Sequence, residues 1–178
     1  MAGKQKFFVL SAALFGVAAI PASATLPTPP QDAATRDAQA YLFYGGAGDI
    51  FEISTSMAII QKSANPQVRA FATNLIAGHT QLSSTALATA AGAGITPPPP
   101  EMTADQKAMI TQLLNASPAN LDRTYLQQQV PAHQQALSLQ RGYSRSGDNA
   151  ALRQAASAAV PVIEQHLAAA QQLLGSVR

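Results

Sequence analysis

Residues 66–91 carry the clearest structural pattern of the chain and read PQVRAFATNLIAGHTQLSSTALATAA. Pro66 suits the first turn of a helix, and no further proline interrupts the run. Apolar side chains recur at helical spacing, at Val68, Phe71, Ala72, Leu75, Ile76, Leu82 and Ala86. His79 falls near the middle of this apolar face. The pattern therefore predicts one long helix that turns a histidine toward the core.

Prolines and glycines divide the rest of the chain into segments of similar kind. We expect a first helix over about 37–63 and a stiff connection at 92–100, which holds two glycines and four consecutive prolines. A short helix over about 103–115 follows, and then long helices over about 118–144 and 147–174. Runs of alternating β-branched residues are missing. The prediction is an all-α four-helix bundle with a short extra helix in its long crossover connection.

The first 24 residues have the order of a secretory signal peptide. Lys4 and Lys6 precede an apolar run over 7–20, and small residues then offer a cleavage site after Ala24. The run is shorter than the roughly 20 residues that a membrane-spanning helix needs. We therefore expect export to the periplasm of a Gram-negative bacterium, or secretion, with no transmembrane anchor in the mature chain.

The mature chain divides into a tether and one domain. Residues 25–36 are rich in proline and favour an extended conformation, whereas 37–178 carry the helical pattern. With 47% hydrophobic and 11% charged residues, the chain is too apolar to be disordered as a whole. Pro131 and Pro161 fall inside predicted helices. We expect the packed bundle to tolerate both, the alternative being kinks on either side of a site.

Charge and composition exclude several classes of function. Removing residues 1–24 takes away two of the 11 basic residues and none of the nine acidic ones, so the mature chain is formally neutral. No basic stripe with interleaved aromatic residues remains, and we expect no nucleic-acid partner. With no cysteine, disulfides and thiolate sites are excluded. The charge-poor outer faces favour a homo-oligomer or a periplasmic protein partner.

All three histidines are predicted to face one core. His133 follows Leu126 and Val130 at helical spacing, and His166 lies on the apolar face of the last helix. On the first helix, the expected inward stripe has Glu52 at its flank and consists of Ile50, Ile53, Met57 and Ile60. Buried imidazoles need polar partners, and the nearby candidates are Glu52, Asp122, Tyr125 and Glu164.

Imidazoles from three helices indicate an interior site for a divalent transition metal such as Zn, Cu or Fe. Neutral imidazole ligates these ions, and carboxylates serve as ligands or as partners of the ligands. The candidate metal residues are His79, His133, His166, Glu52 and Asp122. The alternative is a set of separately hydrogen-bonded core histidines. A third reading is a pH-responsive core, because burial lowers the pKa of neutral histidines.

Signs of catalysis are thin, and we assign no catalytic residue. Di-iron bundles use Glu-x-x-His, but the positions three residues before the histidines hold Ile76, Val130 and Ile163. Ser83 follows His79 without the Gly-x-Ser-x-Gly turn of a hydrolase. The glycine-rich segment 45–48 lacks the lysine of a phosphate-binding loop. A binding function is favoured over an enzyme.

These segments resemble the exported bacterial family known as domain of unknown function 4142 (DUF4142), over about residues 41–174. The matching stretches are 49–52 (DIFE), 68–72 (VRAFA), 79–80 (HT), 121–125 (LDRTY), 129–130 (QV) with His133, and 160–167 (VPVIEQHL). The resemblance implies a ferritin-like helical bundle and export, with Pro161 as a normal feature, and it implies no established reaction. It places Glu52, His79, Asp122, His133 and His166 on recurring polar positions.

The chain departs from that pattern at Gly78, where the family usually has an acid before the first histidine. Together these observations predict an exported helical bundle that acts as a binding or stress-related accessory protein. The alternative is a metal-binding protein with an interior His/carboxylate site.

Overall fold

A computed structural model describes residues 28–177, and its elements in that range are all helical. They are η1 (Gln31–Ala33), α1 (Ala38–Lys62), α2 (Pro66–Gly92), α3 (Ala104–Leu114), α4 (Leu121–Ser146) and α5 (Ala150–Ser176). The all-α prediction is confirmed. The predicted signal peptide and the first residues of the tether lie outside the described residues. No helix among those described is both long enough and apolar enough to cross a membrane.

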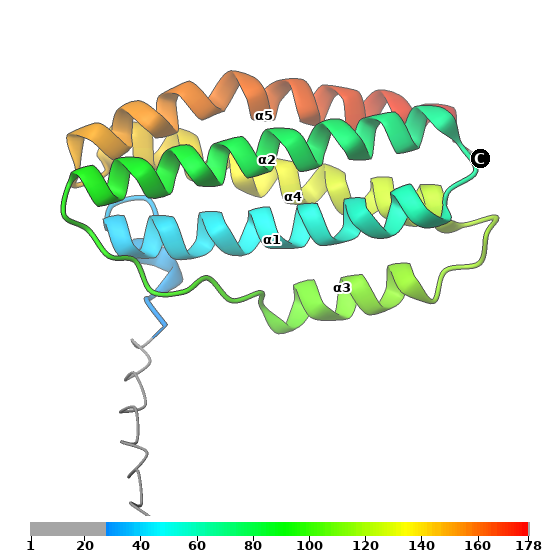
Figure 1. The fold of residues 1–178 in the computed structure, drawn as a ribbon, viewed down its shortest axis with the longest axis horizontal. Coiled ribbons are helices and arrows are strands. Elements are labelled where there is room, and N and C mark those ends of the chain that lie inside the picture. The colour runs from blue at the N-terminus through cyan, green and yellow to red at the C-terminus, as the bar shows by residue number, and fades with distance from the viewer. Residues whose placement is uncertain (1–27, 178) are drawn as a thin grey trace, which may run out of the picture.

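The four long helices form a ferritin-like bundle (Figure 1). Helix α1 contacts α2 and α4, and α5 contacts the same two helices. Each of these neighbouring pairs is antiparallel, so α2 and α4 run in the same direction (Figure 1). The connection between them must therefore return along the length of the bundle, and it does so through α3, which packs on α1 and α4. This is the predicted crossover with its short extra helix.

Polar side chains fix where the helices begin. The Asp37 side chain accepts a hydrogen bond from the backbone N–H of Ala40 at 2.8 Å, and Asn65 caps α2 ahead of Pro66. Thr103 and Gln106 form a reciprocal capping box at the start of α3. Asn149 caps α5 in the same way as Asp37 caps α1. These caps explain why most predicted boundaries lie within a residue or two of the observed ones.

Helix α5 begins at Ala150, three residues later than predicted, and helix α4 also begins three residues later than predicted. The N–H of Asn120 donates to the carbonyl of Ser117 at 2.9 Å, which places Pro118 at the second position of a turn instead of the first turn of the helix. Further along, α4 continues through Pro131 and α5 continues through Pro161. The expectation that the bundle tolerates both prolines is confirmed.

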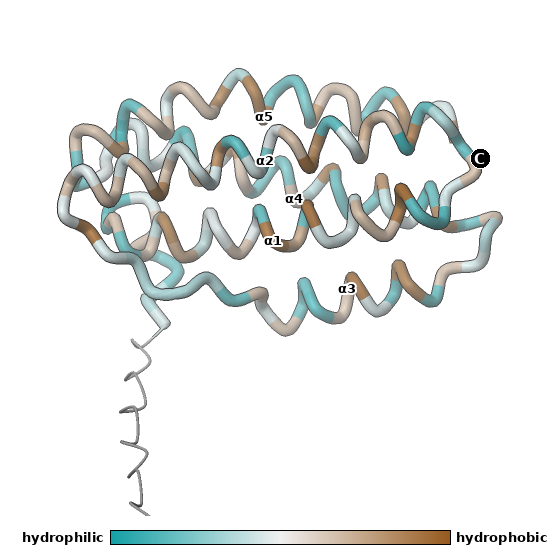
Figure 2. Tube along the Cα trace, in the orientation of Figure 1, coloured by the Kyte–Doolittle hydropathy of each residue, from teal (hydrophilic) through white to brown (hydrophobic). Residues whose placement is uncertain are grey.

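The core has a large apolar cluster at each end, and in the middle polar side chains lie next to a smaller apolar cluster of Leu137, Ala159 and Ile163. One end packs Ile59, Phe71, Leu75, Leu113 and Leu126, and the other packs Tyr41, Leu42, Tyr143 and Leu152. In Figure 2, hydrophilic and hydrophobic residues alternate along each long helix, as amphipathic helices require. The three histidines lie between the two apolar ends.

The predicted inward stripe of α1 is wrong. Met57 is 53% exposed, whereas Glu52, Thr55 and Ser56 are buried together with Phe51 and Ile59. The buried face carries polar groups because α4 satisfies them. Two hydrogen bonds do so, between Ser56 Oγ and the Tyr125 hydroxyl at 2.7 Å and from Gln129 Nε2 to Thr55 Oγ1 at 2.9 Å. The stripe of Ile50, Ile53, Met57 and Ile60 is therefore not the core face of this helix.

Candidate metal centre

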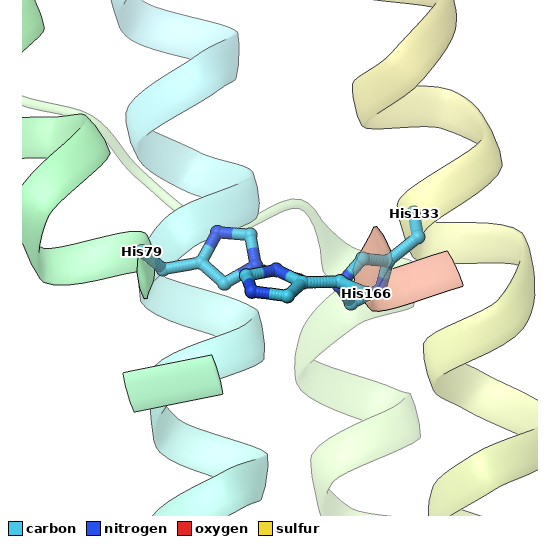
Figure 3. Close-up of side chains that lie close together, drawn as sticks. All are labelled: His79, His133 and His166. Carbon is cyan, nitrogen blue, oxygen red and sulfur yellow. Dashed lines mark hydrogen bonds between the residues drawn. The ribbon is translucent and has the colours of Figure 1, made fainter. Parts of the chain in front are cut away.

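Three imidazoles from three helices meet in the middle of the bundle (Figure 3). His79 of α2, His133 of α4 and His166 of α5 have ring centroids 5.3 to 5.6 Å apart. One nitrogen from each ring lies within 4.8 Å of the other two. His79 and His133 are fully buried, and His166 is half-buried.

The fourth long helix adds two carboxylates. Glu52 of α1 is buried, with Oε2 3.1 Å from His79 Nδ1 and Oε1 3.1 Å from His133 Nδ1. One helical turn earlier, Asp49 Oδ1 accepts a hydrogen bond from His79 Nδ1 at 2.8 Å. Ser83 of α2 donates its hydroxyl to Asp49 Oδ2. Every long helix therefore contributes at least one residue to the cluster.

Hydrogen bonds fix which ring nitrogens face the centre. His133 Nδ1 lies 2.9 Å from the backbone carbonyl of Gln129, which can only accept, so this nitrogen carries a proton. In the neutral His133, Nε2 then carries no proton and has a lone pair to offer. Asp49 and Glu52 contact Nδ1 of His79 in the same way. Nε2 of His79 therefore faces Nε2 of His133, at a distance of 3.4 Å.

The same contacts shift the protonation of the cluster. Burial raises the pKa of Glu52 to about 7, with His79 opposing this rise. Burial lowers the pKa of His79, but Glu52 and Asp49 together raise it by more, so it lies above its ordinary value. Burial and the nearby His79 lower the pKa of His133 to about 3 and that of His166 to about 4. At neutral pH the metal-free centre therefore holds two neutral imidazoles, His133 and His166, beside His79, whose pKa the two carboxylates raise.

Gly78 makes room for the third imidazole. A Cβ atom on this residue would lie 2.5 Å from Cε1 and 2.9 Å from Nε2 of His166. The ring of His166 therefore packs directly against the backbone of α2. In the sequence, Gly78 stands where the family usually has an acid. In the structure, the absence of a side chain at Gly78 lets the imidazole of His166 approach His79.

The structure brings together four of the five predicted site residues and places the fifth, Asp122, apart from them. Asp122 lies in the first turn of α4, eleven residues before His133, or about 16 Å along a helix axis. Two groups of side chains in the described residues could hold a metal ion, the three histidines and the group of Asp49, Glu52 and His79. Asp122 belongs to neither group. The other proposed partners are also engaged elsewhere, since Glu164 pairs with Arg141 and Tyr125 bonds to Ser56.

Sequence reasoning missed Asp49, because it took the wrong face of α1 as buried. The available signal was its place one helical turn before Glu52, which puts both carboxylates on one side of the helix.

Comparison with known proteins agrees with this architecture. A family described as "Domain of unknown function (DUF4142)" matches residues 23–173. The chain belongs to this family. No curated protein matches it.

Two solved structures share the fold of this DUF4142 chain. "CopM in the Cu(II)-bound form" is 16% identical with a TM-score of 0.68, covering 79% of this chain and 97% of that one. "Crystal structure of DUF305 fragment from Deinococcus radiodurans" is 15% identical with a TM-score of 0.67, covering 85% of this chain and 99% of that one.

Proposed function

We propose that this DUF4142 protein binds one divalent transition-metal ion in the interior of its bundle, and that copper is the first metal to test. The ligands are His79 Nε2, His133 Nε2 and the imidazole of His166. Glu52 and Asp49 contact the opposite nitrogens of the rings, so they orient the ligands and do not occupy the coordination sphere. A fourth position stays open for water or an external ligand.

The 3.4 Å separation between His79 Nε2 and His133 Nε2 carries this proposal. Two nitrogens bound at 2.0–2.1 Å to a tetrahedral ion lie about 3.3–3.4 Å apart. A hydrogen bond between them would be long, since ordinary N–H bonds have heavy-atom distances of about 2.7–3.2 Å. The two ring nitrogens therefore have the spacing of two ligands on one tetrahedral metal ion.

The surroundings of the rings support the same function. Metal-binding histidines commonly donate their second ring N–H to a carboxylate or a backbone carbonyl, which fixes the tautomer and the ring orientation. His79 and His133 both do so here. The low pKa values of His133 and His166 keep these two ligands unprotonated at neutral pH, so a metal ion does not have to displace a proton from them.

Two observations favour copper among the candidate metals. Nitrogen sites bind Cu²⁺ more tightly than Zn²⁺ or Fe²⁺ when geometry is equal, although the tetrahedral spacing of the two nitrogens is the geometry that Zn²⁺ prefers. In addition, a protein with the same fold has been solved in a Cu(II)-bound form. Combined with the predicted signal peptide, the site supports a metal-binding accessory protein of the periplasm, which unites the two functions that the sequence suggests. Self-association and a protein partner stay predictions.

Elemental analysis of protein purified without an affinity tag tests the proposal, followed by titration with Cu²⁺, Zn²⁺ and Fe²⁺. We expect one tightly bound ion per chain, lost in His133→Ala. Gln134→Ala is the matched control, because this exposed neighbour does not face the cluster and its variant should bind like the wild type. Unchanged metal content in His133→Ala would overturn the assignment.

A further inference from the structure

An open groove runs between α1, α4 and the first turns of α3, with a volume of about 810 Å³. Asp49 and Glu52 line its inner part, and Asp105 of α3 lines it near the surface. None of the lining residues, all within the described part of the chain, is lysine, arginine or histidine. The groove is therefore acidic along its depth.

The carboxylates connect the groove to the histidines. The side chain of Asp49 is 19% exposed, whereas those of His79 and Glu52 are each 1% exposed. Asp49 thus faces the groove on one side and His79 Nδ1 on the other. Behind it, both Glu52 oxygens are buried and have no hydrogen bond among the described residues, apart from their ion-pair contacts with the two imidazoles. In its ionised form, this buried carboxylate attracts a cation to the inner end of the groove.

A second hollow of about 370 Å³ also reaches Asp49, between α1, α2, α5 and the prolines of residues 97–100. Its walls include Leu82, Ala86 and Leu87, and Asp49 is its one charged lining residue in the described part of the chain. Moving a hydrated cation across such an apolar wall is costly. The acidic groove is the more favourable path.

We propose that this groove is the entrance through which a divalent cation reaches the three histidines, with Asp105 and Asp49 as successive carboxylates along the way. The inference rests on the proposed metal-binding function and adds the route by which the site is loaded. Carboxylate oxygens lining a cleft raise the local concentration of cations and replace part of their hydration shell. The rate of loading should therefore depend on the charge of the groove, and the final affinity should depend on the histidines.

Arginine variants of two neighbouring residues separate the rate of metal loading from the final affinity. Gln134 and Gln135 are both exposed on α4, but Gln135 lines the groove and Gln134 does not. Gln135→Arg places a positive charge and extra bulk in the entrance, while Gln134→Arg makes the same change beside it. The probe is Cu²⁺ alone, mixed in a stopped-flow instrument and followed by quenching of tyrosine fluorescence, because the chain has no tryptophan.

At low ionic strength, we expect Gln135→Arg to slow association by about fivefold or more, whereas Gln134→Arg stays within about twofold of the wild type. Asp105→Asn should slow association by about twofold, and the differences should shrink in 0.5 M salt. The stoichiometry should stay at one ion in every variant. Equal association rates in the two arginine variants would overturn the groove as the entrance while leaving the metal site intact. Absence of Cu²⁺, Zn²⁺ and Fe²⁺ binding to the wild type would overturn both proposals.

Discussion

Gly78 of α2 lies against the imidazole of His166 of α5, so closely that a Cβ atom would come within 2.5 Å of the ring. An imidazole is the end of a flexible side chain, and it can swing away when that space is filled. The fold therefore does not depend on this glycine, whereas the position of the third candidate ligand does.

Gly78→Ala should separate metal affinity from stability. Displacing His166 should weaken Cu²⁺ binding by about tenfold or more. The metal-free protein should be as stable as the wild type or more so, because alanine exceeds glycine by up to about 1 kcal/mol in a helix interior. Competition titration and urea unfolding measure the two quantities. Gly92→Ala, where an added Cβ meets nothing within 4 Å, is the control and should leave affinity unchanged.

Glu52→Gln should weaken metal binding by about 10- to 100-fold, the range for residues that orient metal-binding histidines. The variant keeps the shape of the side chain but removes the charge that holds His79 Nδ1 and His133 Nδ1. Asp122→Asn makes the same kind of change away from the cluster, and its affinity should match the wild type. Equal losses in the two variants would contradict the role given to Glu52.

Acid should destabilise the metal-free protein from about pH 6.5 downward. The pKa values of His133 and His166 are about 3 and 4 in the folded chain. The unfolded chain therefore binds two protons near pH 6.5 that the folded chain does not bind at this pH. Glu52 has the opposite effect down to about pH 4.5, because its pKa in the folded chain is about 7. In this range the folded chain binds a proton at Glu52 that the unfolded chain does not bind. His79 binds a proton in both states below pH 6.5 and has no net effect there.

The free energy of unfolding should therefore fall by up to about 1.4 kcal/mol per pH unit between pH 6.5 and 4.5, and more steeply below. Urea unfolding of metal-free protein at several pH values measures this slope. A stability that stays flat from pH 6.5 to 4.5 would show that the buried imidazoles do not keep their low pKa values.

Removing the metal should lower thermal stability. An ion that binds only the folded chain adds about 2.7 kcal/mol at a free concentration of 100 times Kd. We expect the Tm to rise as Cu²⁺ is added and to return after treatment with a chelator. His133→Ala should show no such response, and a Tm shift of the same size in that variant would place the stabilising ion elsewhere.

The sequence predicted the helices well because local signals define them. Asp37, Asn65 and Thr103 cap helices in the structure where breakers marked their starts. The apolar faces of α2, α4 and α5 also placed His79, His133 and His166 inward, and these faces are buried as predicted.

The same reasoning predicted the wrong buried face for helix α1, because the buried face of this helix is partly polar. Thr55 and Glu52 find their partners on other helices, and a single helix does not reveal such long-range pairing. Asp122 was predicted as a site residue from its place among the family's recurring polar positions and from its helical face, which considers only the rotation about the helix axis. That argument ignores the distance along the helix axis, which separates Asp122 from His133 by three turns.

Pulsed electron paramagnetic resonance on protein loaded with one equivalent of Cu²⁺ tests the central claim most directly. We predict modulation from the remote nitrogens of coordinated imidazoles, reduced in each of His79→Ala, His133→Ala and His166→Ala. A spectrum with oxygen ligands alone, or one that all three variants leave unchanged, would contradict a metal centre built from these histidines.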